Sequence, residues 1–590
     1  MLEERENSSR RVTGVARFIP LLTWLPAYER SWLPLDVIAG LTLWGLVVPE
    51  AMAYAGIAGL PPQAGLYTLV AAMLIYALLG TARHLSIGGT SAGAALLASS
   101  VAAALVASST ANASDPQTYQ TYASAFVLVV GLVFLVAGLA GLGFITQFLS
   151  KPVMDGFVVG LASFVAVGQL YKLLGVPKPD GNTIEKLVGT IKQLPEANWT
   201  TCAVSVVALA LLFILPRLSK RIPGGLLVLF GSIALSSALD LAGTHGVEVV
   251  GTLPGGLPSV AFPQVPLADY LGMVLPAIGV LLVVFSESLG TANEFAEKHG
   301  YEVNANQELN AHAVANIFSA LFGGMIAGGS MSASAVKEGA GARTQVSNLV
   351  TWLATIVTLL FLTPLFATLP EAVLGALIIH AVWHILAARR LVKLRQSAPV
   401  EVWFGVLAMA GVLFVDVLQG MIIGVVTSLV FVVYRSTRPH VASLGRVPGV
   451  PGAYSDLARH PDDIPVPGVL IVRIDAQMYY ANALTVRDTV KEMVASMEPP
   501  PKALILDASA QDEIDITSTD VLAGLVKQLR EKNIDVYVAE VHAPVLERSR
   551  EVIGEDHAFS TVDAAVRHVE GKLNQDGEEV KPDSPSRSTE

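Results

Sequence analysis

The chain has 590 residues, of which 53% are hydrophobic and only 15% are charged. Soluble proteins carry about 25% charged residues, so we expect most of this chain to lie in lipid. The formal net charge of −11 argues against a nucleic-acid partner, and the single cysteine, Cys202, excludes disulfides and thiolate metal sites.

Residues 1–30 are polar and lack the apolar core of a cleaved signal sequence, so they are predicted to form a cytoplasmic N-terminal segment. Residues 31–438 follow as the predicted membrane domain. A membrane-spanning helix needs about 20 mostly apolar residues. The candidates lie near residues 35–56, 63–80, 123–148, 153–172, 201–216, 223–243, 269–292, 309–327, 346–367, 370–388, 401–417 and 419–434. Two shorter runs begin near Thr90 and Ser330, so about fourteen segments are predicted.

The basic residues indicate the orientation, since cytoplasmic loops carry an excess of Lys and Arg. If the count is right, one side of the membrane holds Arg10, Arg11, Arg17, Arg217, Lys220, Arg221, Arg389, Arg390, Lys393, Arg395, Arg435 and Arg438. The protein is therefore predicted to lie in the plasma (inner) membrane with both termini in the cytoplasm. One loop departs from this charge rule, and we do not use it to assign the orientation. Residues 172–192 belong outside in this topology but contain Lys172, Lys178, Lys186 and Lys192.

The long apolar runs end before Arg438, and the sequence after it has a different pattern. The predicted elements are short apolar strands at 469–475, 503–507 and 534–539 and an amphipathic helix at 519–531. Their alternation predicts a small cytoplasmic α/β domain over residues 439–572. Residues 573–590 are polar and contain proline, which is typical of a disordered tail.

A glycine-rich motif occurs twice in the predicted membrane domain. The sequence GGTSAGAA from Gly88 resembles GGSMSASA from Gly328, and each follows an apolar run that contains a carboxylate, Glu50 or Glu287. Glu50 precedes its Gly-Gly pair by 38 positions and Glu287 precedes its own by 41. The domain is therefore predicted to contain two repeats of seven helices. Because seven is an odd number, the second repeat has the opposite orientation in the membrane.

Each motif has the composition of a helix that begins inside the membrane. A Thr or Ser after Gly-Gly caps free amides, and a helix N-terminus carries about half a positive charge. Two such N-termini, opposed across the midplane, would bind an anion without a full positive charge. The alternative is that both motifs are small-residue surfaces for helix packing. Because the copies are in register and each has an acidic partner, we favour a binding site.

A carboxylate at the centre of a membrane helix is costly, by about 2.5–3.5 kcal/mol on insertion scales, so such groups usually line a polar cavity. Glu287 shares its helical face with Thr291 and could carry a proton or bind sodium. The alternative is a structural carboxylate tied to neighbouring helix ends. For Glu50 the alternative is that it satisfies the amides freed by Pro49.

Three segments resemble the sulfate permease (SulP) family of anion transporters: DVIAGLTLWGLVVPEAMAYAGIAGLPPQAGLYT (36–68), SESLGTANEFAEKHGYEVNANQELNAHAVANIFSALFGG (286–324) and GGSMSASAV (328–336). The segment VLIVRIDAQMYYANA and the residues around Asp515 resemble the STAS domain of the same family. The resemblance implies fourteen spans in two inverted repeats, a core domain that moves against a gate domain, and a homodimer. It implies substrate binding by Thr90, Ser91, Ala92, Ser330, Met331 and Ser332, with Glu50 beside them, and cation coupling by Glu287 and Thr291.

The chain departs from the family pattern at three positions. Many relatives have glutamine where this chain has Glu50, arginine where it has Ala333, and an aromatic residue where it has Ala64. The site is thus less positive than usual, and proton binding at Glu50 or Glu287 would compensate, which favours anion–proton symport. A sodium-coupled bicarbonate symporter stays open, since such members also lack the arginine. Thr517 is either a phosphorylation site, by analogy with anti-sigma-factor antagonists, or a helix cap.

The sequence therefore predicts an α-helical polytopic membrane protein that is a secondary active transporter of a small inorganic or carboxylate anion, working by elevator-type alternating access. No enzyme and no cofactor are predicted beyond a co-transported H⁺ or Na⁺. The expected partners are the anion, membrane lipid, a second copy of the chain and a regulatory protein at the STAS domain. A passive anion channel stays open as an alternative, and a nucleobase–cation symporter is disfavoured by the STAS-like domain.

Overall fold

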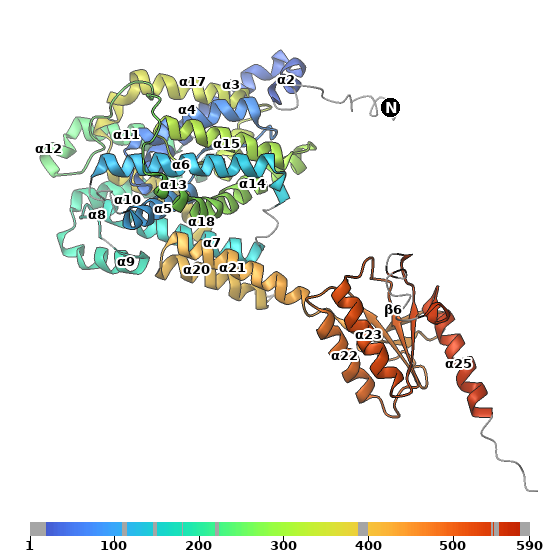
Figure 1. Cartoon of the computed structure of the whole chain (residues 1–590). Coiled ribbons are helices and arrows are strands. Elements are labelled where there is room, and N and C mark those ends of the chain that lie inside the picture. Colours follow the sequence, from blue (N-terminus) through green and yellow to red (C-terminus); the bar gives the residue numbers. More distant parts are fainter. Residues whose placement is uncertain are drawn as a thin grey trace, which may run out of the picture. The chain divides into compact units, whose positions relative to one another are not determined.

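The computed structural model describes residues 19–108, 115–144, 150–179, 181–218, 224–386, 399–543, 545, 547 and 554–578. The chain divides into two compact units, Met1–Leu429 and Val430–Glu590, and each is described by itself (Figure 1). Residues 1–18 of the predicted N-terminal segment and residues 579–590 of the predicted tail lie outside the described residues, as do most of the basic residues that predict the orientation. The predicted domain limits stay predictions.

The first half of the membrane unit is built from long helices: α3 (Leu33–Ile57), α4 (Pro62–Leu79), α5 (Ser91–Ala107), α6 (Pro116–Leu139), α7 (Lys151–Val167), α10 (Trp199–Leu218) and α11 (Gly224–Leu239). Four short helices lie before, between or after them: α2 (Leu21–Trp24), α8 (Leu170–Leu174), α9 (Thr183–Lys192) and α12 (Leu241–His245). A four-residue strand, β1 (Ser86–Gly89), comes directly before α5.

The second half repeats this order of parts. Its helices are α13 (Leu267–Val280), α14 (Ser286–His299), α15 (Ala305–Leu321), α16 (Met331–Gly339), α17 (Val346–Val357), α18 (Glu371–Leu386), α20 (Pro399–Phe414) and α21 (Val417–Ser436). The strand β2 (Ala327–Ser330) comes directly before α16, as β1 comes before α5. A π-helical turn, Leu281–Phe285, joins α13 to α14.

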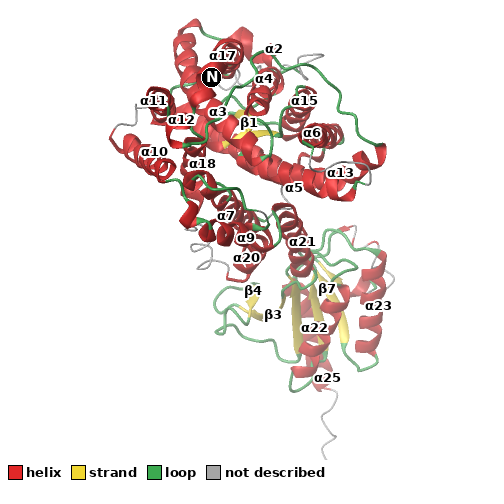
Figure 2. Ribbon diagram, turned by 90° about the vertical axis from the view of Figure 1, so that its left-hand side faces the viewer, coloured by secondary structure: helices red, strands yellow, loops and turns green. Residues whose placement is uncertain are grey.

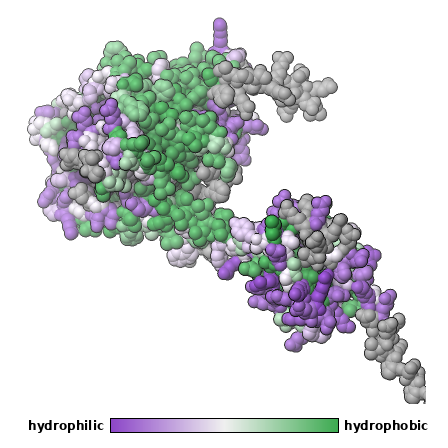
Figure 3. All heavy atoms as spheres, in the orientation of Figure 1, coloured by the Kyte–Doolittle hydropathy of each residue, from purple (hydrophilic) through white to green (hydrophobic). Residues whose placement is uncertain are grey.

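The surface of this unit is suited to lipid. Among the described residues, seven helices are long and apolar enough to cross a membrane, and five shorter helices are apolar. Large apolar side chains cover one face of the unit (Figure 3), and Val106 is 87% exposed. Lipid can solvate such side chains, while helices satisfy their own backbone groups. The predicted polytopic helical architecture is therefore confirmed, whereas the count of fourteen segments stays a prediction.

Small residues let helices of this unit pack backbone to backbone. A Cβ added at Gly65 of α4 would lie 2.0 Å from the carbonyl oxygen of Ala51 in α3. A Cβ added at Gly156 of α7 would lie 2.0 Å from the carbonyl oxygen of Gly405 in α20. Neither position therefore has room for a side chain.

The second unit is an α/β domain, as predicted. Its sheet has the strand order β4-β3-β5-β6-β7-β8, with β3 (Val441–Arg446), β4 (Tyr454–Asp456), β5 (Val469–Ile474), β6 (Ala503–Asp507), β7 (Asp535–Ala539) and β8 (Ala558–Phe559). Strands β5 to β8 are parallel, and β3 pairs antiparallel with both β4 and β5. One face of the sheet packs against α22 (Ala483–Ser496) and α23 (Ile516–Arg530), and the other against α25 (Val562–Glu578) (Figure 2).

Candidate anion-binding site

The two glycine-rich motifs meet in the structure. Strands β1 and β2 pair antiparallel, with Ser86 opposite Ser330 and Gly88 opposite Gly328. The pairing satisfies backbone groups that would otherwise be unpaired inside the membrane. The helices α5 and α16, which continue from the two strands, therefore begin at opposite ends of one short ladder.

The predicted caps of both helices are present. The Thr90 hydroxyl accepts a hydrogen bond from the Gly93 amide at 3.0 Å, and the Ser330 hydroxyl accepts one from the Ala333 amide at 3.3 Å. The first amides of a helix have no partner within the helix, and each cap satisfies one of them. The amides of Ser91 and Ala92 in α5, and those of Met331 and Ser332 in α16, therefore have no partner within their helices.

The glycines allow the ladder to lie close to its neighbours. A Cβ added at Gly328 would lie 2.5 Å from Val284 Cγ1, and one added at Gly88 would lie 2.7 Å from Leu69 Cδ2. A Cβ added at Gly329 would lie 3.0 Å from the Cα of Ser288 in α14. Any larger residue would push the strands away from the helices that surround them.

A small central cavity adjoins the ladder. It has a volume of about 10 Å³ and is lined by Val47, Glu50, Leu69, Met73, Ser86, Gly88, Gly89, Ser330 and Ala333. One water needs about 10–15 Å³, so the cavity has room for about one water. It brings together two of the predicted substrate-binding residues, Glu50 and Ser330; the other five do not line it.

The predicted coupling residue Glu287 belongs to the first turn of α14, directly after the π-helical turn. Its neighbour Ser288 accepts a hydrogen bond from the Gly329 amide at 2.7 Å and donates one to the Val284 carbonyl at 2.6 Å, which ties α14 to β2. Thr291 is buried one turn further along α14. The predicted coupling helix therefore contacts the predicted substrate site through Ser288.

Tyr54 adjoins Glu50 on the same helix. It lies one turn further along α3 and is 7% exposed. A buried hydroxyl therefore neighbours the carboxylate that lines the central cavity.

A buried lysine near the site was not anticipated from the sequence. Lys337 of α16 is 0% exposed, and its Nζ donates hydrogen bonds to the Leu85 carbonyl at 3.2 Å and to Asn348 Oδ1 at 3.1 Å. Gln345 and Asn348 donate to the same carbonyl at 3.0 and 3.2 Å. Leu85 directly precedes Ser86 of the ladder, so Lys337 fixes the start of β1. Its only sequence signal is a lysine within the apolar and small-residue run of the second motif.

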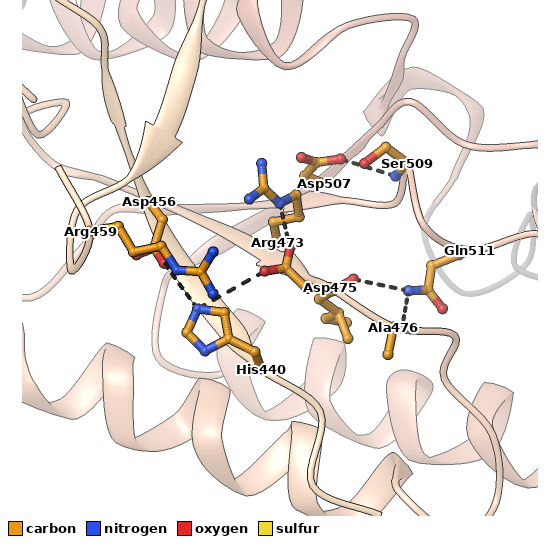
Figure 4. Close-up of polar contacts among 10 residues, drawn as sticks. His440, Asp456, Arg459, Arg473, Asp475, Ala476, Asp507, Ser509 and Gln511 are labelled. Carbon is orange, nitrogen blue, oxygen red and sulfur yellow. Dashed lines mark hydrogen bonds and ion pairs between the residues drawn. The ribbon is translucent and has the colours of Figure 1, made fainter. Parts of the chain in front are cut away.

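The second unit contains a cluster of charged residues on and beside strands β3, β4 and β5 (Figure 4). His440 Nε2 lies 2.9 Å from Asp456 Oδ2, and Arg473 Nε lies 2.6 Å from Asp475 Oδ1. The hydrogen bond with His440 lowers the pKa of the Asp456 carboxyl. Among the described residues, no three His, Cys, Asp or Glu side chains are placed to hold a metal ion, and we interpret the cluster as structural.

Thr517 is exposed and is the second residue of α23. The helix cap is Asp515, whose carboxylate accepts hydrogen bonds from the amides of Ser518 at 2.8 Å and Tyr480 at 2.6 Å. Burial raises the pKa of Asp515, but the hydrogen bonds that its carboxylate accepts together lower it by more. The alternative that Thr517 is the cap is therefore wrong, while its phosphorylation stays a prediction.

Paired half-helices in a repeated helical unit place this chain in the class of membrane transporters with inverted repeats. Comparison with known proteins gives the family. Residues 33–409 match the sulfate permease family and residues 460–565 match the STAS domain. The chain belongs to the sulfate permease family and is an anion transporter with a C-terminal STAS domain, not an enzyme.

Similar proteins extend over nearly the whole chain. The probable sulfate transporter Rv1739c of Mycobacterium tuberculosis is 34% identical over 566 residues, which cover 93% of this chain and 99% of the relative. Sulfate transporter 1.3 of Arabidopsis thaliana is 29% identical and covers 97% of this chain and 90% of the relative.

Two solved structures share the fold. The murine Slc26a9 anion transporter in its inward-facing state has a TM-score of 0.86 at 22% identity, covering 97% of this chain and 98% of that one. The transmembrane domain of the cyanobacterial bicarbonate transporter BicA has a TM-score of 0.58 at 24% identity, covering 67% of this chain and 98% of that one.

Proposed function

We propose that this protein is a secondary active transporter of a small oxyanion, with sulfate as the first candidate, coupled to protons. The observation that carries the proposal is the pair of half-helices, which begin at the two ends of a strand ladder that lines a cavity together with Glu50. Amides at a helix N-terminus bind anions, and a protonatable carboxylate beside them links anion binding to proton binding. The names of the sequence relatives support sulfate.

Alternating access is the proposed mechanism. The central cavity of about 10 Å³ is smaller than a small oxyanion requires, so its walls must move for the anion to bind and leave. The ladder ties α5, α14 and α16 into one group, which supports movement of this core against the remaining helices as a body. We also propose a homodimer in the inner membrane, both termini cytoplasmic, with the STAS domain as the site of a regulatory protein.

A sodium-coupled bicarbonate symporter is the second candidate. It is favoured by the likeness in fold to BicA and by Ala333, which leaves the start of α16 without a side-chain cation. Thr291, buried one turn from Glu287, would offer a hydroxyl to a bound Na⁺.

Uptake into proteoliposomes separates these candidates. Labelled sulfate, bicarbonate and dicarboxylates are supplied under an imposed proton gradient, an imposed sodium gradient, or neither. Uphill accumulation of sulfate that needs the proton gradient supports the first proposal, and accumulation of bicarbonate that needs sodium supports the second. Downhill flux alone would identify a channel, and no flux of any of these anions would contradict both proposals.

A further inference from the structure

Another cavity, with a volume of about 180 Å³, lies at the end of the membrane unit where α3 begins and α4 ends. Three segments line this tryptophan cavity: α2 and the turn before α3 contribute Trp24 and Trp32, the chain after α4 contributes Gly80, Thr81 and Arg83, and the chain before α17 contributes Thr344 and Gln345. None of these residues lines the central cavity. The volume is roughly ten times the 10–15 Å³ or so that one water needs, so the phosphate of a lipid headgroup has room in it.

Two hydrogen-bond donors of the tryptophan cavity lack an acceptor. Trp24 Nε1 is buried and has no hydrogen-bond partner among the described residues. Arg83 is exposed and forms no ion pair with a described residue; its Cζ lies over the Tyr301 ring, 5.5 Å from the ring centre. A guanidinium has five N–H donors, so this contact with a ring leaves donors for an acceptor. Since a buried N–H needs an acceptor, the cavity is fitted for an occupant with oxygen acceptors.

The other polar side chains of the lining already have partners. The Thr81 hydroxyl donates to Glu308 Oε1 at 2.6 Å, and the Thr344 hydroxyl donates to Asp36 Oδ2 at 2.7 Å. Gln345 Nε2 donates to two backbone carbonyls, at 2.6 and 3.0 Å. Both carboxylates are buried and neither lines the cavity. Among the described residues, the lining therefore has one charge, the positive charge of Arg83.

The segments that contribute the two tryptophans also have an apolar surface. Six large aliphatic side chains from α2 to α3 are 38% to 57% exposed: Leu22, Leu25, Leu33, Leu35, Ile38 and Leu41. Lipid acyl chains can solvate such side chains. Tryptophan is typical of the depth of the lipid headgroups, where its apolar ring and its polar N–H both find suitable surroundings. Donors for a headgroup and a surface for acyl chains therefore occur in the same part of the molecule.

We propose that the tryptophan cavity binds the phosphate of an anionic phospholipid. The phosphate accepts hydrogen bonds from Arg83 and from Trp24 Nε1, and the acyl chains lie on the apolar side chains of α2 and α3. Arginine matches phosphate in geometry and charge, so a lipid with net negative charge is favoured over a zwitterionic one. With the N-terminus in the cytoplasm, as proposed above, the cavity faces the cytoplasmic leaflet, whose surface is negative. The inference goes beyond the proposed function, because its ligand is a lipid and not the transported anion.

The test measures the binding of labelled dioleoylphosphatidylglycerol to the purified full-length chain in detergent. The competitors are unlabelled dioleoylphosphatidylglycerol, dioleoylphosphatidylcholine and sodium phosphate, with sodium chloride of equal ionic strength as the control for the salt. Phosphatidylglycerol is expected to displace the label at a concentration roughly threefold to tenfold lower than phosphatidylcholine. Sodium phosphate is expected to displace no more than sodium chloride does. Equal competition by the two lipids, or full displacement by sodium phosphate, which would identify a site for free phosphate, would overturn the lipid site.

Arg83→Gln is expected to raise the dissociation constant for phosphatidylglycerol roughly threefold to tenfold. Trp24→Phe keeps a ring but removes the N–H, and a rise of roughly twofold to fivefold is expected. Arg30→Gln is the matched control, because it removes an exposed arginine of the turn before α3 that does not line the cavity. An unchanged dissociation constant in Arg83→Gln, or an equal rise in Arg30→Gln, would overturn the site. If Arg83→Gln cannot be purified, Trp24→Phe decides by the same comparison. The proposed function is tested by anion uptake instead, so the two can fail separately.

Discussion

Ser86 lies opposite Ser330 in the ladder of β1 and β2, so a residue of each repeat belongs to one strand pair at the candidate site. The Ser86 amide donates to the Ser334 hydroxyl at 2.8 Å, and that hydroxyl donates to the Ser330 carbonyl at 2.7 Å. These two hydrogen bonds connect β1, which leads into α5, to the first turn of α16. A change that separates the strands is expected to disturb both helix N-termini together.

Gly328→Ala is expected to abolish anion uptake. The added Cβ would lie 2.5 Å from Val284 Cγ1, so β2 or the helix beside it must shift. Overpacking of this kind typically costs about 1–3 kcal/mol, and the shift falls on a binding site. The measurement is sulfate uptake, normalised to the amount of protein in the membrane. Gly339→Ala in α16 is the matched control, because a Cβ there meets nothing within 4 Å, and uptake is expected to persist.

Glu287→Gln is expected to remove accumulation that is driven by a cation gradient, while insertion into the membrane persists. The amide keeps the size of the side chain but cannot take up a proton, and it is a weaker ligand for sodium. Uphill uptake under imposed gradients is the measurement. Glu294→Gln changes an exposed carboxylate two turns along the same helix and is expected to behave like the unaltered chain. Accumulation that survives in Glu287→Gln would exclude this residue from coupling.

The sequence predicts well those features of the site that are local. Thr90 and Ser330 each follow a Gly-Gly pair, and the hydroxyl of each caps the helix that begins directly after it. Both helix starts can therefore be predicted from a few neighbouring residues. The strands β5, β6 and β7 of the second unit are likewise visible as short apolar runs. Periodicity and capping need only neighbouring residues, and these are present in the sequence.

Features that need contacts between distant segments are not visible in the sequence. The pairing of Gly88 with Gly328 joins residues 240 positions apart, and Lys337 bonds to a carbonyl 252 positions away. The ion pair between Lys172 and Glu371 likewise appears only when the helices are packed. The sequence alone does not show which lysine has an acidic partner.

Asp456→Asn is expected to destabilise the STAS domain at neutral pH. The hydrogen bond with His440 holds the pKa of Asp456 below its usual value, so the folded state favours the carboxylate. The stabilising contribution is present above the usual aspartate pKa of about 3.9 and is lost as the pH falls through the lowered value. Thermal unfolding of the purified full-length chain is therefore compared at a series of pH values. The difference from the unaltered chain is expected to shrink in acid, whereas Asp462→Asn, at an exposed position of the same unit, is expected to show little effect at any pH.

Lys337→Met is expected to weaken anion binding and to destabilise the membrane unit. Without the Lys337 Nζ, Asn348 Oδ1 loses a hydrogen-bond donor at a fully buried position, which typically costs about 1–3 kcal/mol. The site also loses the one lysine of α16, which would raise the KM for sulfate roughly tenfold if the charge contributes about 1.4 kcal/mol. Lys337→Gln separates the two effects, because its amide donates a hydrogen bond but carries no charge. A glutamine variant with an unchanged KM would limit Lys337 to fixing β1, whereas a raised KM at normal thermal stability would establish that its charge acts on the anion.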